Sequence, residues 1–306
     1  MKKKILILAG GYSKEREISL LTAKSVFREL KKTKKYRLKI ADPSFGFVSL
    51  LKKYKPNVVF NALHGQFGED GYVQSILESI KVKYTHSGVM SSFMAMDKEI
   101  SKKIFIKNKI LTPKYIKYIF KDTIDRNILN LIKKKLGLPV VIKPLNEGSS
   151  VNVYICNKKN IFQNLKKLKN YKEILIEKFI PGREIQVAIL GKKKIGAIEL
   201  KPKRQFYDYE AKYNPKAKTK HIIPVDLTPK EYKKINEIAL KAHNLLKCKG
   251  VTRSDFRFYK GKFYLLEVNT QPGMTSLSLV PEIARYRKIS FLKLIEWMIK
   301  DASINR

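Results

Sequence analysis

Apolar and polar positions follow two different patterns along the first part of the chain, short apolar runs and a helical period. Residues 5–9 form a short apolar run that ends in two glycines, and the segment 13–30 then repeats apolar residues at helical spacing. A second apolar run at 56–65 precedes the helical pattern of 68–80. Short buried strands that alternate with helices are typical of a parallel, doubly wound sheet. The pattern therefore predicts a Rossmann-like α/β domain over residues 1–87.

Polar residues near the ends of these segments add detail to that domain. Ser13 is placed to cap the first helix, and Glu15 and Glu17 are expected in its first turn, where a negative charge is favourable. Residues 81–88 are predicted to add a further short strand.

After residue 88 the pattern changes from strand–helix alternation to paired strands. Segments that indicate strands and hairpins occur at 138–156, 174–180, 183–201 and 251–269. Thr228 and Glu231 form a capping box around Pro229 for a helix to about Lys247. We therefore predict two α+β domains, a central one over 88–181 and a C-terminal one over 182–306.

Three further segments complete the predicted secondary structure. Helices are expected at 98–109 and 122–137. A last amphipathic helix carries Phe291, Leu294, Ile295 and Met298 on one face. The stretch 201–220 has no sustained period and is expected to be a long loop.

The charge of the chain is strongly positive but evenly spread. The sequence has 65 lysine and arginine residues against 26 acidic ones, a net charge of +39, and lysines occur in every segment. A nucleic-acid-binding module would gather arginine and aromatic residues in one place. We therefore predict no nucleic-acid partner, although a positive field favours anionic ligands such as nucleotides.

The sequence also indicates the cellular compartment of the protein. No apolar stretch is long enough to cross a bilayer. The apolar core of the N-terminal segment is short, and charge returns at Lys14, so a buried strand is favoured over a signal peptide. Cys156 and Cys248 are too few for a disulfide framework and are predicted to be free thiols. These features favour a cytoplasmic protein with no membrane association.

Oxygen donors gather on the two strands of the 251–269 hairpin. Glu267 and Asn269 lie two residues apart and so share one face of a strand, as do Arg253 and Asp255. Two carboxylates and an amide could hold Mg²⁺, with the arginine beside metal-bound phosphate. A cross-strand ion pair in an exposed hairpin is an equally good interpretation.

A Gly-Ser loop at 146–150 follows a strand that ends near Lys143. Its backbone amides and hydroxyls could bind an anion, although an ordinary hairpin turn explains it too. Lys143 within an apolar strand requires a negative partner, because a buried unpaired charge is costly. His64 precedes a glycine-rich loop at the edge of the parallel sheet where α/β folds bind ligands.

Eight segments, in order, resemble the D-alanine–D-alanine ligases of the ATP-grasp superfamily along nearly the whole chain. They are GGYSKEREIS, ALHGQFGEDGYVQ, YTHSGV with MDK, LPVVIKPLNEGSS, ILIEKFI, FYDYEAKY, RSDFRF and EVNTQPGMTSLSLVP. The resemblance implies an α/β N-terminal domain followed by two ATP-grasp domains that clamp the nucleotide between antiparallel sheets.

The resemblance also implies an ATP and metal site. Asp255, Glu267 and Asn269 would hold two Mg²⁺ ions, for which Mn²⁺ may substitute. The residues implied to contact ATP are Lys98, Lys143 and Lys212 at the phosphates, Glu147 and Ser149 in the Gly-Ser loop, Glu177, Phe179 and Ile180 at the adenine, and Glu184 at the ribose.

The implied reaction joins two D-alanines through a D-alanyl phosphate, with release of ADP and phosphate. Glu15 would bind the first ammonium and His64 would lie near the first carboxylate. The other implied residues are Arg253 and Gly273 at the oxyanion, Ser278 and Leu279 at the second carboxylate, and Ser150 and Tyr213 in a hydrogen-bonded set with Glu15. The product would serve peptidoglycan precursor synthesis, and the enzyme would be a homodimer, as its relatives are.

Three positions are notable against the family pattern. Asn152 and His86 stand where glycine is usual, and asparagine tolerates a left-handed backbone better than most residues. Gln271 falls at a variable position. Tyr213 favours the dipeptide product over D-alanyl-D-lactate.

Two alternative functions remain open from the sequence. They are a D-alanine–D-lactate ligase and an inactive, basic nucleic-acid-binding protein on the same scaffold.

Overall fold

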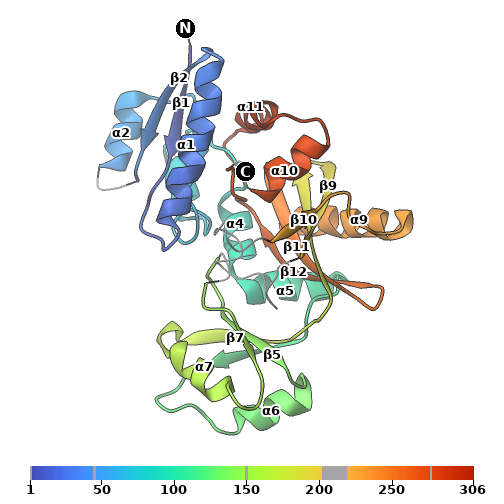
Figure 1. The fold of residues 1–306 in the computed structure, drawn as a ribbon. Coiled ribbons are helices and arrows are strands. Elements are labelled where there is room, and N and C mark those ends of the chain that lie inside the picture. The colour runs from blue at the N-terminus through green and yellow to red at the C-terminus, as the bar shows by residue number, and fades with distance from the viewer. Residues whose placement is uncertain (1, 44–45, 149–150, 202–218, 276–277) are drawn as a thin grey trace.

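The computed structural model describes residues 2–43, 46–148, 151–201, 219–275 and 278–306, and it contains three sheets that follow one another along the chain. Figure 1 shows the N-terminal sheet in blue, the central region in green below it, and the C-terminal region in orange and red beside it. The prediction of an α/β N-terminal domain followed by α+β ATP-grasp architecture is confirmed.

The N-terminal sheet is parallel and has helices on both faces. Its strand order is β2-β1-β3, with β1 at Lys3–Leu8, β2 at Tyr36–Ala41 and β3 at Val58–Asn61. Alternate residues of β1 enter different cores, Ile5 and Ile7 with α1 (Arg16–Lys32) and Leu6 and Leu8 with α2 (Phe47–Tyr54) and α3 (Tyr72–Ser79). The alternation follows from the two-residue period of a strand.

Two local predictions in this domain are wrong. Helix α1 begins at Arg16 with Glu15 at the N-cap and no side-chain cap. The Ser13 hydroxyl instead accepts from the Glu15 amide, at 3.1 Å, and donates to a carbonyl oxygen of the neighbouring loop. Residues 81–88 form no full strand, since only Tyr84 makes isolated bridges, to Val59 and Ser303.

The central sheet is antiparallel, with the order β4-β7-β5-β6. Its strands are β4 (Tyr115–Ile119), β5 (Val140–Pro144), β6 (Tyr154–Cys156) and β7 (Glu173–Lys178). Helices α6 (Ile128–Lys135) and α7 (Ile161–Lys167) pack on it through one apolar cluster, and the short 3₁₀ helix η1 (Lys169–Tyr171) leads into β7. The predicted pair of strands around the Gly-Ser loop is therefore β5 and β6.

The C-terminal sheet has the order β10-β9-β8-β11-β12 and is antiparallel. Its strands are β8 (Arg183–Leu190), β9 (Lys193–Lys201), β10 (Lys220–Ile222), β11 (Val251–Tyr259) and β12 (Lys262–Asn269). Helix α9 (Pro229–Leu245) covers one face, and α10 (Leu279–Tyr286) and α11 (Phe291–Asp301) cover the other. Both predicted hairpins and the capping box of Thr228 with Glu231 are present.

Helix α4 (Val89–Met96) lies between the N-terminal and C-terminal sheets, and α5 (Lys98–Lys107) lies between the C-terminal and central sheets (Figure 1). Asp97 caps α5 by accepting from the amides of Glu99 and Ile100, at 2.9 Å each. Strands β2 and β4 and helices α2, α4, α7 and α10 had not been predicted. Most of them are short, so their apolar periods are weak.

Two sequence-based expectations about the whole chain can be checked. Cys156 and Cys248 are free and buried. None of the helices in the described ranges is both long enough and apolar enough to cross a membrane. The long loop expected at 201–220 lies largely outside the described residues.

Candidate active site

The oxygen donors of the C-terminal hairpin lie opposite one another across β11 and β12. Asp255 pairs in register with Glu267, and Arg253 with Asn269, so all four share one face of the sheet. Arg253 binds Asp255 along its own strand, with Nε–Oδ1 at 2.7 Å and Nη2–Oδ2 at 2.8 Å. The prediction that these residues converge is confirmed by the register.

The chemistry of this donor set fits a hard divalent cation. Asp255 and Glu267 supply carboxylates and Asn269 supplies an amide oxygen, which are the donors that Mg²⁺ accepts beside water and phosphate. Within the described residues no three His, Cys, Asp or Glu side chains form a metal-binding group.

A cluster of buried lysines faces the same region from α5 and β5. Lys143 Nζ lies 2.9 Å from Glu177 Oε2, which supplies the negative partner that the sequence required. Lys102 Nζ lies 2.8 Å from Glu177 Oε1, and its side chain is fully buried. Lys98 Nζ donates to the carbonyl of Glu147 at 2.6 Å. Lys102 and Lys143 thus share Glu177, and Lys98 contacts the Gly-Ser loop.

Burial and charge act in opposite directions on this cluster. Burial lowers the pKa of Lys102 to about 8, although Glu177 opposes the change. Burial alone would raise the pKa of Glu177, but Lys102 and Lys143 bring it below its usual value. The glutamate therefore stays ionised at neutral pH and acts as a hydrogen-bond acceptor.

Two adjoining cavities meet at this cluster. Glu15, His64, Arg253 and Gly273 line the first, and Lys143, Glu177, Ile180, Glu184 and Asp255 contribute to the second. The residues that line both are Lys98, Glu147 and Glu267. The acid predicted to bind metal and the lysine predicted to bind phosphate therefore stand at the junction of the two cavities.

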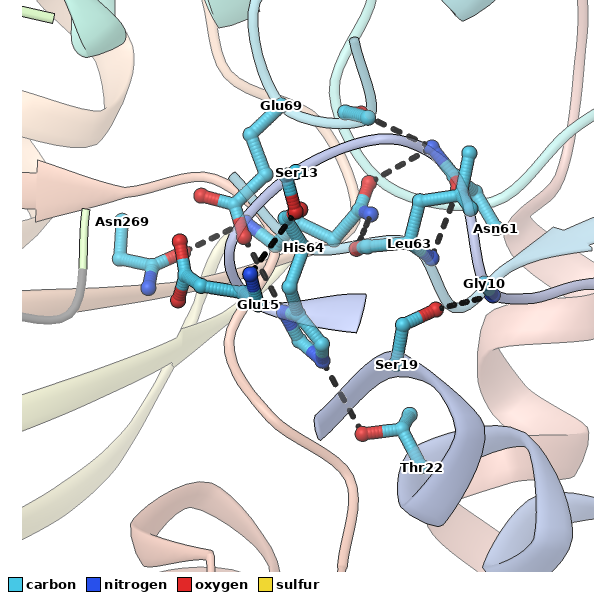
Figure 2. Close-up of polar contacts among 12 residues, drawn as sticks. Gly10, Ser13, Glu15, Ser19, Thr22, Asn61, Leu63, His64, Glu69 and Asn269 are labelled. Carbon is cyan, nitrogen blue, oxygen red and sulfur yellow. Dashed lines mark hydrogen bonds and ion pairs between the residues drawn. The ribbon is translucent and has the colours of Figure 1, made fainter. Parts of the chain in front are cut away.

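Glu15 and His64 enter the first cavity from the N-terminal domain (Figure 2). His64 Nε2 lies 3.0 Å from Thr22 Oγ1, and its Nδ1 lies 3.1 Å from Glu69 Oε1, so the ring is held at both nitrogens. Ser13 fixes the backbone of both site residues, since its hydroxyl donates to the His64 carbonyl at 2.5 Å and accepts from Glu15.

Two glycines make room for the Glu15 carboxylate. A Cβ atom at Gly65 would lie 2.6 Å from Glu15 Oε2, and one at Gly148 would lie 2.9 Å from the same oxygen. These glycines belong to different domains, the first to the loop after β3 and the second to the Gly-Ser loop. Any larger residue at either place would displace the carboxylate.

The turn after β12 adds Gly273 and Ser278 to the same region. Ser278 Oγ accepts from the amide of Thr275 at 2.9 Å and lies 2.8 Å from its hydroxyl. A Cβ atom at Gly273 would come within 2.9 Å of Ser278 Oγ. Leu279 is the first residue of α10, so its amide lies at the positive end of a helix, where anions bind favourably.

The other predicted ATP contacts lie around the second cavity. Phe179, Ile180 and Glu184 line it. Glu184 Oε2 is 2.9 Å from Arg257 Nη2, and its Oε1 accepts from Gln186 at 3.1 Å. Ser149, Ser150, Lys212 and Tyr213 lie outside the described residues, so the structure brings together the predicted site without those four.

Comparisons with known proteins agree with this geometry. The family profile described as "D-ala D-ala ligase C-terminus" matches residues 105–300. The chain is 66% identical to a D-alanine–D-alanine ligase of Pelagibacter ubique (strain HTCC1062) over 306 residues, with all of both chains covered. The chain belongs to the D-alanine–D-alanine ligase family.

More distant members of this family share the same fold. A ligase of Wolbachia pipientis wMel is 43% identical over 97% of this chain and 94% of its own. A crystal structure of the Bacillus anthracis ligase superimposes with a TM-score of 0.86 at 34% identity, and another from that organism, complexed with ATP, with 0.84 at 30%. Each match covers 98% of this chain and 97% of the other.

Asn152 and His86, which stand where the ligase family usually has glycine, both adopt a backbone conformation typical of glycine. Asn152 has φ 56° and His86 has φ 71°, so both occupy the left-handed region that glycine adopts without strain. Asn152 also donates to the hydroxyl of Tyr171 at 2.6 Å and accepts from Tyr154 at 3.2 Å. These two bonds help to hold the asparagine in its left-handed conformation.

Two lysines near the site were not predicted from the sequence pattern. Lys102 shares the buried face of α5 with Lys98 and Phe105, and this helical spacing was visible in the sequence. Lys14 Nζ contacts Glu147 Oε1 at 3.1 Å and the hydroxyl of Tyr171 at 3.0 Å. No local sequence pattern indicates these contacts of Lys14, because its partners lie 133 and 157 residues away.

Proposed function

We propose that this member of the family is an ATP-dependent ligase that joins two D-alanines and releases ADP and phosphate. The observation that carries the proposal is the pairing of Asp255 with Glu267 on the C-terminal sheet, in a cavity that Lys98 of α5 and Lys143 of β5 also line. A family relationship over the full length supports the same activity. The product would enter peptidoglycan precursor synthesis in the cytoplasm, and the enzyme would act as a homodimer.

Phosphate chemistry would occupy the junction of the two cavities. Lys98 and Lys143 would neutralise the ATP phosphates, with Lys212 joining them from outside the described residues. Glu147 and Ser149, which belong to the Gly-Ser loop, would contact the phosphates. Glu177 and the backbone of Phe179 and Ile180 would bind the adenine, and Glu184 would bind the ribose.

Asp255, Glu267 and Asn269 would hold the metal. Bound Mg²⁺, or Mn²⁺ in its place, would supply charge neutralisation at the transferring phosphoryl group. Two ions are proposed.

The first cavity would hold the amino acids. Glu15 would bind the ammonium of the first D-alanine and His64 would lie near its carboxylate, which attacks the γ-phosphate to give the acyl phosphate. The amine of the second D-alanine would then attack that carbonyl, and phosphate would leave. Arg253 and the Gly273 amide would stabilise the tetrahedral oxyanion.

The second D-alanine would be positioned by its carboxylate. Ser278 and the Leu279 amide would bind it at the start of α10. Ser150 and Tyr213, with Glu15, would complete a hydrogen-bonded set over both substrates. Closure of the segment that carries Tyr213 would exclude water from the acyl phosphate.

The first experiment measures phosphate release from ATP and Mg²⁺ with D-alanine, with L-alanine and with no amino acid. We expect release only with D-alanine, together with dipeptide formation. Glu267→Ala should lower kcat by more than about 100-fold, because it removes a proposed metal ligand. Glu296→Ala is the matched control, since Glu296 lies on α11 and contacts Lys35 at 3.3 Å. Equal release with L-alanine would overturn the proposed substrate.

A D-alanine–D-lactate ligase remains the alternative within the family. D-Lactate offered as the second substrate separates the two, since hydroxyl and ammonium acceptors respond oppositely to pH. We expect dipeptide and no depsipeptide. A nucleic-acid-binding role would require a salt-dependent shift of labelled DNA at physiological ionic strength.

A further inference from the structure

Gln271 lies in the turn after β12, between the residues that line the first cavity. Asn269, Thr270 and Gly273 contribute to the wall of that cavity. The Gln271 side chain is 2% exposed, so it is buried beneath this wall. In the family pattern its position is variable, and the sequence alone predicts no role for it.

The side chain of Gln271 binds the loop after β3 in the N-terminal domain. Its Oε1 accepts from Asn61 Nδ2 at 2.8 Å. Its Nε2 donates to the backbone carbonyl of Leu63, the residue immediately before His64. Asn61 is fully buried and Leu63 is 1% exposed, so both bonds are shielded from water.

The main chain of Gln271 binds the other side of the site. Its amide donates to Asn269 Oδ1 at 2.8 Å, which orients the amide group proposed to bind metal. Gln271 therefore contacts Asn269, a proposed metal ligand, through its main chain, and the loop that carries His64 through its side chain. These two segments are about 200 residues apart in the sequence and belong to different domains.

We propose that Gln271 is a positioning residue that sets the His64 loop in register with the metal-binding turn. The two hydrogen bonds of its side chain fix the distance between the proposed first-substrate site and the proposed metal site. Misplacement of reacting groups by about 1 Å can lower the rate by on the order of 100-fold. The hydrogen bonds of Gln271 therefore affect catalysis although Gln271 does not contact the substrate. This inference rests on the proposed ligase function.

The test compares Gln271→Met with Gln74→Met. Methionine keeps the length of the side chain and removes both polar ends. Gln74 is 1% exposed, and its Nε2 donates to the Gly68 carbonyl at 2.8 Å, so its side chain binds the same loop from within the N-terminal domain. The control therefore removes a buried amide from the same region and leaves the tie between the domains intact.

For Gln271→Met we expect kcat/KM for the first D-alanine to fall by about 10- to 100-fold, whereas KM for ATP stays within about twofold. The adenine end of the proposed ATP site lies in the second cavity, away from the turn. Gln74→Met should change kcat/KM for the first D-alanine by less than about threefold. Should Gln271→Met fail to fold, Gln271→Glu carries the same measurement, because it keeps the acceptor for Asn61 and loses the donor to Leu63.

Hydrogen exchange gives a readout that does not depend on activity. In Gln271→Met, amides in both the 61–69 loop and the 269–275 turn should exchange faster, whereas Gln74→Met should affect the first segment alone. Equal kinetics and equal exchange in the two variants would overturn the inference. If the unmodified enzyme released no phosphate with D-alanine, the proposed function would fail instead, and the exchange result would still test the tie.

Discussion

Lys102 keeps its ammonium group fully buried against Glu177, 2.8 Å away. An ion inside a protein loses its hydration, and only a close partner of opposite charge compensates that loss. Glu177 has two such partners, Lys102 on α5 and Lys143 on β5. At the scale of single residues, the proposed adenine site thus depends on a charge balance set by a lysine that lines neither cavity.

Loss of the shared carboxylate should be more harmful than loss of one lysine. Lys102→Met leaves Glu177 and Lys143 as an intact pair at 2.9 Å, so we expect the free energy of unfolding to fall by only about 1 kcal/mol. Because the glutamate is then held from one side, KM for ATP should rise. The double variant Lys102→Met/Glu177→Gln leaves the buried Lys143 without that carboxylate, and its free energy of unfolding should fall by about 3 kcal/mol. Urea unfolding measures both effects, and a double variant as stable as Lys102→Met would contradict the account.

The loop between β5 and β6 shows how elements meet around the site. Asn152 on this loop binds Tyr171 of η1, and Tyr171 and Lys14 both contact Glu147. Lys14 comes from the N-terminal domain, so the cluster joins two domains at the edge of the first cavity. The side chain of Lys14 is 61% exposed, however, and an exposed ion pair contributes little to stability.

Substitutions at Asn152 separate its backbone role from its side-chain role. Asn152→Gly removes the bonds to Tyr171 and Tyr154 but accepts φ 56° without strain. Asn152→Ala removes the same bonds and adds about 1 kcal/mol of left-handed strain. We expect the alanine variant to have the lower free energy of unfolding by about that amount. Thermal unfolding of the pair measures this difference, and equal stability would show that the loop relaxes.

On the scale of the whole molecule, the N-terminal and C-terminal domains share one apolar core. Ile5 and Val26 of the first domain pack in the same cluster as Ile283 and Leu294 of the last. His86 is buried near this junction, with its ring 5.7 Å from that of Phe60. His243 is buried behind the C-terminal sheet and lies 2.8 Å from Thr252 Oγ1. Both imidazoles lie where a positive charge is poorly solvated.

These two histidines predict how stability depends on pH. Burial, together with Arg306, lowers the pKa of His86 to about 3, and burial lowers the pKa of His243 to about 4. The unfolded chain binds a proton at each near pH 6.5, so it takes up more protons than the folded chain below that pH. Stability should therefore fall as the pH decreases from about 6.5 towards 4.

The expected slope is up to about 1.4 kcal/mol per pH unit for each histidine. Urea unfolding at pH 7, 6 and 5 measures it in the unmodified protein and in His243→Gln, which should have the shallower slope. An identical pH dependence in the two proteins would rule out His243 as a contributor.

The sequence by itself determined the order of the domains, both C-terminal hairpins and the chemistry on one face of β11 and β12. These features depend on residues close together in the chain, where periodicity and strand alternation act directly. The three-dimensional structure decided which lysine balances Glu177, which side chains surround Glu15, and that Gln271 contacts Asn61. Those contacts join segments about 50 to 210 residues apart, as for Glu15 with Gly65 and Gln271 with Asn61. They depend on how three sheets pack, which no local pattern records.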